Sequence, residues 1–182
     1  MSRRESPAAA FAALIFAICH LRRGPDEVPH SRPLFGALVA ASVTLDVFAG
    51  AVLGDAADAL QRSLVSTGLV LLLCWIALAL RRLAHRYVQT AIALVACSMV
   101  FTLLALPLAW LMGPAPASPA PLTPLQTLVG WAMLAIVAWN IAVNAHIVRR
   151  ALDAPFALGF ALALAWAIAD WALGYALFDA AS

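Results

Sequence analysis

The chain has 182 residues, of which 65% are hydrophobic and only 11% are charged, and its mean hydropathy is +0.95. A water-soluble domain carries about 25% charged residues, so this composition excludes a soluble globule and indicates that lipid is the solvent. The net charge of +2 gives no reason to expect a nucleic-acid partner. All 11 basic residues are arginine. Together with the abundant alanine, this favours a bacterial genome rich in G and C.

The first apolar stretch, residues 6–21, is too short to cross a bilayer comfortably, because a spanning helix needs about 20 residues. Phe11, Leu14, Ile15 and Ile18 recur at helical spacing along one side of it. This pattern predicts an interfacial helix that lies on the cytoplasmic face of the membrane.

Five longer apolar runs follow a linker, residues 24–33, whose three prolines and mixed charge predict an extended segment. Lipid requires every backbone polar group to be paired within a helix or a closed barrel. The runs lack the alternation of barrel strands, so we expect an all-α membrane protein with a five-transmembrane-helix bundle. The predicted parts are a cytoplasmic helix and linker over 1–33 and a membrane domain over 34–182, with spans at about 34–54, 64–80, 88–112, 128–148 and 156–178.

The arginines predict the orientation of these spans. Ten of the 11 precede the first span, lie between the second and third, or lie between the fourth and fifth. Cytoplasmic loops are enriched in arginine, so we expect the N-terminus in the cytoplasm and the C-terminus outside, in a bacterial inner membrane. The remaining arginine, Arg62, is expected in an outer loop beside Asp55 and Asp58.

Two carboxyl groups fall inside the predicted spans. Asp46 and Asp170 lie roughly 18–21 Å from the inner surface at 1.5 Å per residue, in the outer half of the hydrocarbon. A charge at such a depth costs at least about 2.5–3.5 kcal/mol. With no basic residue expected there, each carboxyl should be neutral or face a polar group or a water-filled cavity. The functional interpretation is a proton or cation site, and the structural one is a carboxyl bonded to a neighbouring helix.

Other polar residues could extend such a site. Asn140 and Asn144 share one face of the fourth span, and Ser98 and Thr102 form a similar stripe on the third. They either bond to neighbouring helices or form a polar path toward the two aspartates. The candidate intramembrane polar site is therefore Asp46, Asp170, Asn140, Asn144, Ser98 and Thr102.

Asp170 also lies on a face of small residues, which are Gly159, Ala163, Ala167 and Gly174. A stripe of this kind lets another helix approach closely, within this chain, in a second copy or in another membrane protein. It favours the structural interpretation, in which Asp170 bonds two helices together.

The chain carries no familiar signature of catalysis. Motifs such as H-E-x-x-H and G-x-S-x-G and the phosphate-binding glycine loop are absent from the sequence. The three cysteines, Cys19, Cys74 and Cys97, lack metal-ligand spacing and are expected to be small buried hydrophobic residues. We expect a protein that is not an enzyme, with no catalytic residue, metal or cofactor.

The overall plan resembles the Yip1 family of small multi-pass membrane proteins. Residues 86–90, Arg-Tyr-Val-Gln-Thr, enter a span that ends in Ala-Leu-Pro at 105–107, which is similar to the third-span region of bacterial Yip1-like proteins. Residues 146–152, ahead of the last span, are reminiscent of bacterial membrane proteins of this layout. Eukaryotic members act as membrane-trafficking scaffolds, so the resemblance implies a scaffold and assigns no site residue.

Two functions follow as expectations. The first is a non-catalytic scaffold or assembly protein, whose partners are the bilayer and other membrane proteins. The alternative is a small proton- or cation-coupled transporter that uses Asp46 and Asp170. The alternative requires these two carboxyls to lie close together or to line one cavity.

Overall fold

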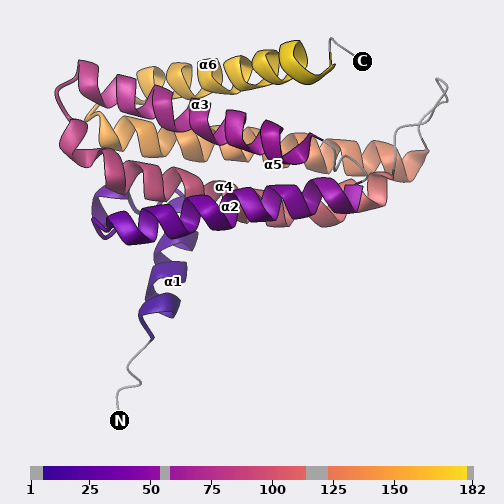
Figure 1. Cartoon of the computed structure of the whole chain (residues 1–182), viewed down its shortest axis with the longest axis horizontal. Coiled ribbons are helices and arrows are strands. Elements are labelled where there is room, and N and C mark those ends of the chain that lie inside the picture. The colour runs from indigo at the N-terminus through magenta and orange to yellow at the C-terminus, as the bar shows by residue number, and fades with distance from the viewer. Residues whose placement is uncertain (1–5, 54–57, 114–122, 180–182) are drawn as a thin grey trace.

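The computed structural model describes residues 6–53, 58–113 and 123–179, in which all regular structure is helical. Five helices are long and apolar enough to cross a membrane, and consecutive ones run in opposite directions (Figure 1). The chain is therefore a multi-pass membrane protein, as predicted. The helices are α2 (Arg32–Leu53), α3 (Ala59–Leu80), α4 (Tyr87–Met112), α5 (Pro124–Ala151) and α6 (Phe156–Gly174), and α6 continues into a π-helical turn, η3 (Tyr175–Asp179).

Local signals explain where α5 begins and ends. The Thr123 hydroxyl accepts a hydrogen bond from the Gln126 backbone N–H at 3.2 Å, and the Gln126 side chain accepts one from the Thr123 N–H at 2.9 Å. This capping box, followed by Pro124 in the first turn, satisfies donors that a helix start leaves unpaired. Arg149 and Arg150 occupy the last turn, where positive charge is favoured by the helix dipole.

Helix α4 is the centre of the bundle. In its most apolar window 44% of the residues are buried, against 6–17% in the other four spans. Every residue from Thr90 to Cys97 is buried, which places the densest packing in the first half of α4. The apolar core gathers around this half and includes Ile92, Val143 and Ile147, each fully enclosed.

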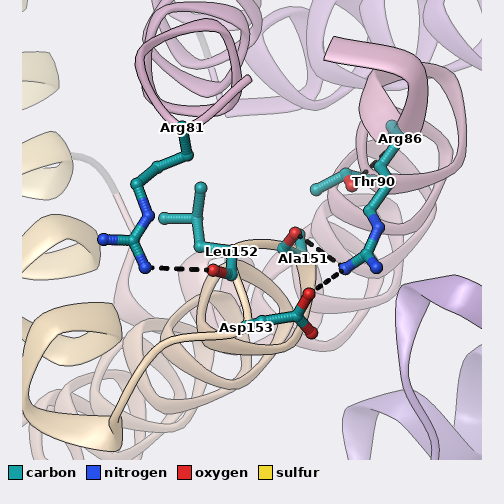
Figure 2. A network of polar contacts seen from close by, with 6 residues as sticks. All are labelled: Arg81, Arg86, Thr90, Ala151, Leu152 and Asp153. Atoms are coloured by element: carbon teal, nitrogen blue, oxygen red, sulfur yellow. Dashed lines mark hydrogen bonds and ion pairs between the residues drawn. The ribbon is translucent and has the colours of Figure 1, made fainter. Parts of the chain in front are cut away.

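One end of the bundle collects arginines, and we call it the arginine end: there α2, α4 and α6 begin and α3 and α5 end. Figure 2 shows Arg81 and Arg86 reaching the turn that joins α5 to α6. Arg86 donates to the Asp153 carboxylate at 2.7 Å and to the Ala151 carbonyl at 3.3 Å, and Arg81 donates to the Leu152 carbonyl at 3.4 Å. These guanidinium groups satisfy carbonyls that the end of α5 leaves unpaired.

The short N-terminal helix α1 (Pro7–Cys19) projects from the bundle, and its C-terminal half lies against the other helices (Figure 1). The apolar side predicted from the sequence is the side that meets the bundle. Leu14, Ile15 and Ile18 are buried, and Phe11 packs at the edge of the core. The chain then returns toward the arginine end through the short turn η1 (Pro25–Glu27).

Side-chain donors hold this returning segment through its backbone carbonyls. Trp139 Nε1 donates to the Cys19 carbonyl at 2.9 Å, His146 Nε2 to the Arg23 carbonyl at 2.9 Å, and Gln89 Nε2 to the Val28 carbonyl at 2.7 Å. Trp139 lies about 18 Å along α5 from Ala151 at 1.5 Å per residue. The hydrogen bond to Trp139 therefore places the C-terminal end of α1 inside the bundle and not on its surface.

The cysteine prediction is confirmed. Cys19, Cys74 and Cys97 are each at most 2% exposed, and none forms a disulfide. Cys19 lies against Cys97, and a hydrogen bond between the two thiols lowers the pKa of Cys19, while burial acts in the opposite direction. This contact joins the end of α1 to the buried half of α4.

Helices α5 and α6 approach most closely at Gly159. A Cβ added there would lie 2.6 Å from the Ala145 carbonyl oxygen and 2.7 Å from Arg149 Cβ. We therefore expect Gly159→Ala to destabilise the protein by about 1–3 kcal/mol, because overpacking forces the helices apart. The measurement is reversible unfolding in mixed detergent micelles.

The matched control is Gly68→Ala in α3, where an added Cβ meets nothing within 4 Å. This control should leave stability unchanged or raise it slightly, since alanine suits a helix better than glycine. Equal stability of both variants would contradict the close contact at Gly159.

A second prediction concerns the attachment of α1. Trp139→Phe keeps an aromatic ring beside Phe101 and His20 but removes the hydrogen bond to the Cys19 carbonyl. We expect Cys19 to react with a maleimide several-fold faster in this variant, with the labelled residue identified by mass spectrometry. Trp131→Phe, at a position on α5 that is 67% exposed, should not change the rate. An unchanged Cys19 rate in Trp139→Phe would show that this bond does not hold α1.

Candidate functional site

A cleft extends from the middle of the bundle toward the end away from the arginines, and we call it the polar cleft. All five spanning helices line it, and its volume is about 640 Å³. It extends to Gly50 near the end of α2, Ala59 at the start of α3 and Phe178 in η3. Sites for small ligands are typically clefts of roughly 300–1,000 Å³, so the size suits a small molecule or an ion with water.

The structure brings every candidate polar residue to this cleft. They come from α2, α4, α5 and α6, and in the sequence they are spread over more than a hundred residues. The six that line it are Asp46, Asp170, Asn140, Asn144, Ser98 and Thr102. The two carboxyls therefore line one cavity, which is the arrangement that the transporter alternative requires.

Asp46 is bonded by hydroxyl groups from two neighbouring helices. Ser63 of α3 donates to Asp46 Oδ2 at 2.8 Å, and Thr102 of α4 donates to Oδ1 at 3.4 Å. Asp46 itself is half-buried. The carboxyl thus joins α2, α3 and α4 at the wall of the cleft, and the short bond from Ser63 stabilises its charged form.

The two asparagines bond to each other. Asn144 Nδ2 donates to Asn140 Oδ1 at 2.8 Å, one turn earlier on α5. The Ser98 hydroxyl likewise stays on its own helix and donates to the Val95 carbonyl at 2.8 Å. Within the described part of the chain, the side chains of Asn140, Asn144 and Ser98 therefore bond within their own helices and not across helices, which was one of the two expectations. Their remaining polar capacity faces the cleft that they line.

The small face of α6 divides into two parts. Gly159 and Ala163 are buried, and Gly159 meets α5 at the close contact described above. Farther along, Asp170 and Gly174 line the cleft, and a Cβ at Gly174 would meet nothing within 4 Å. Over the described ranges no hydrogen bond or ion pair reaches the Asp170 carboxylate. Asp170 therefore bonds no second helix within the described part of this chain, and a bond to a helix of another copy or another membrane protein stays a prediction.

Sequence reasoning missed several polar residues of this site, among them Ser42 on α2 and the pair Arg62 and Ser63 at the start of α3. Helix α3 begins at Ala59 and not near 64, so both lie inside a membrane helix and line the cleft. The expectations that Arg62 lies in a loop and that no basic residue shares the depth of the aspartates are both corrected. The first turn of α3 is polar, which lowers the hydropathy by which spans are found. The usable signal was Asp58 just ahead, a residue type that favours helix starts.

The charges of the cleft are of both signs. Its lining contributes the carboxyls of Asp46 and Asp170 and the guanidinium of Arg62, whose carbon lies 4.9 Å from the centre of the Phe178 ring. That contact is a cation–π interaction at the far end of the cleft. The hydroxyl, amide and carboxyl groups together can bind a cation or exchange protons with water.

No family model, no curated protein and no solved structure matches this chain. The resemblance to the Yip1 family therefore stays a prediction.

Proposed function

We propose that this protein is a small proton- or cation-coupled transporter whose polar cleft is the binding site. The observation that carries the proposal is the shared lining of that cleft: Asp46 and Asp170 face one cavity together with the four uncharged polar side chains predicted from the sequence. Ionisable residues at membrane depth are costly and usually mark ion or proton pathways. Transporters commonly bind their ions near the middle of the bilayer, between helices.

The orientation belongs to the same proposal. Six arginines lie at the arginine end, and they are Arg32, Arg81, Arg82, Arg86, Arg149 and Arg150. Cytoplasmic segments carry the excess of arginine, so this end is placed in the cytoplasm of a bacterium, with the inner membrane as the location. The N-terminus is then inside and the C-terminus outside. The cleft faces the exterior, and α1 lies along the cytoplasmic half of the membrane.

The test is ion flux into proteoliposomes. A potassium diffusion potential set with valinomycin drives cations inward, and a trapped pH dye reports protons while ²²Na⁺ uptake reports sodium. Wild type should exceed empty vesicles, and Asp46→Asn and Asp170→Asn should each reduce the rate at least tenfold. Asparagine keeps the shape of aspartate but can neither carry a charge nor exchange a proton at neutral pH.

The matched control is Asp153→Asn, at the arginine end and outside the cleft, which should keep the wild-type rate. All variants are compared at equal monodisperse yield, so that loss of fold is separated from loss of flux. Full flux in both cleft variants, or no flux in wild type, would reject the transporter.

A scaffold remains the second candidate, and α1 favours it. This helix projects away from the bundle, and apolar residues such as Phe16, which is 57% exposed, lie on its uncovered side (Figure 1). A scaffold would use α1 and the small-residue faces to contact other membrane proteins. Purification from native membranes separates the two candidates, because a stoichiometric partner lost on removal of residues 1–19 supports assembly. A partner-free particle that conducts ions supports transport.

A further inference from the structure

The hydroxyl groups that reach Asp46 depart from the pattern that Thr44, Thr90 and Ser98 follow in this bundle. A serine or threonine in a helix ordinarily donates to a backbone carbonyl one turn earlier. Thr44, Thr90 and Ser98 do so, at 2.8–2.9 Å. Ser63 and Thr102 instead direct their hydroxyls to one carboxylate on a third helix. Ser63 on α3 and Thr102 on α4 thus lack the local bond to a backbone carbonyl and donate to Asp46 instead.

The convergence places four oxygen atoms together at the wall of the cleft. They are the two carboxylate oxygens of Asp46, Ser63 Oγ and Thr102 Oγ1. A fifth is close in the fold: Ser42 lies one turn before Asp46, is 4% exposed and lines the cleft, and its hydroxyl has no bond to any part of the chain described. Oxygen atoms alone, without nitrogen or sulfur, are the ligands of hard cations.

The spacing of these oxygens suits an ion better than it suits a hydrogen bond at Thr102. Hydroxyl-to-oxygen bonds are usually about 2.5–3.0 Å long, and the Thr102 contact is 3.4 Å. Oxygens that ligate a cation of the size of Ca²⁺ at about 2.3–2.6 Å, at right angles to one another, are roughly 3.3–3.7 Å apart. Sodium has nearly the same radius. The Ser63 hydroxyl, at 2.8 Å, would need only to rotate about its side chain to reach this spacing.

The charge of the site selects the valence of the ion. Asp46 is the single carboxylate among these oxygens, and no three His, Cys, Asp or Glu side chains converge in the ranges that the structure describes. One negative charge balances one monovalent cation. Arg62, the basic residue lining the cleft, directs its guanidinium to the ring of Phe178.

We propose that the polar cleft contains a sodium site formed by Asp46, Ser63 and Thr102, with Ser42 as a further ligand. The inference rests on the proposed function and names the coupling ion of the same cleft. Sodium would then link α2, α3 and α4 by replacing two hydrogen bonds with ion–oxygen contacts. Because the ion binds the folded state, it stabilises the protein by RT ln(1 + [Na⁺]/Kd).

The experiment is thermal unfolding of the full-length protein in detergent, followed by tryptophan fluorescence, during titration with NaCl at ionic strength kept constant by choline chloride. We expect a rise in Tm of several degrees that follows the logarithm of the sodium concentration above the dissociation constant and that KCl does not reproduce. Asp46→Asn and Thr102→Val should each weaken the apparent sodium affinity at least tenfold. Thr102→Ser, which restores the hydroxyl, should recover it.

The matched control is Ser98→Ala, which removes a hydroxyl from the same cleft that is already bonded to its own helix. It should respond to sodium as wild type does. Direct ²²Na⁺ binding to wild type keeps the test decisive if a variant fails to fold. No sodium-specific shift and no ²²Na⁺ binding would overturn the sodium site, and so would equal effects of Na⁺ and K⁺.

The two proposals can fail separately. Proton flux that depends on Asp46, with no sodium binding, would overturn the sodium site and leave the transporter. Sodium binding that depends on Asp46 and Thr102, without any flux, would support the site and reject the transporter.

Discussion

The Asp46 carboxylate finds no hydrogen-bond donor in lipid, and the polar half of the bundle is arranged around this constraint. An unpaired polar group in hydrocarbon costs several kcal/mol, so the surrounding helices must supply the partners. Ser63 and Thr102 do so from α3 and α4, and in return they leave their own backbone carbonyls without the usual side-chain bond. The three helices that share Asp46 are therefore held by polar contacts, whereas the arginine half of α4 is held by apolar packing.

The packing of α5 against α6 explains why the cleft lies where it does. At Gly159 the backbones of α5 and α6 come so close that a methyl group would not fit. About three turns farther along α6, Asp170 borders open space in the cleft. The bulky Trp166, buried between Gly159 and Asp170, lies where the close contact gives way to the cleft.

Much of this arrangement could be predicted from the sequence, because lipid imposes strict rules on length and apolarity. The five spans and the six polar residues are readable as long apolar runs and as the rare polar positions within them. Arg62 and Ser63 were missed because hydropathy averages over a window, and a polar first turn looks like a loop. The pairing of Asn140 with Asn144, and the depth at which α1 joins the bundle through Trp139, depend on which helices become neighbours. A single sequence carries no periodicity that specifies neighbours.

The transporter proposed above would need a second opening, and the contacts around the cleft indicate where this opening would form. The half of the bundle below the cleft is closed in two ways, by the α5–α6 contact at Gly159 and by residues 19–28 lying along α4 and α5. Exposing apolar side chains to lipid costs little, since lipid tails are as apolar as leucine. What holds residues 19–28 is therefore mainly three hydrogen bonds to their carbonyls, from Trp139, His146 and Gln89. Each is worth about 1 kcal/mol net where entering water replaces the broken bond. Trp139 lies on α5 and Gln89 on α4, so a small change in the distance between these two helices disturbs both hydrogen bonds. The contact at Gly159 instead lies within one pair of helices, α5 and α6. Opening at the N-terminal segment is the less costly of the two movements.

Maleimide labelling of Cys19 that rises under an imposed ion gradient is the signature of that movement, and labelling that stays constant during flux would place the second opening elsewhere.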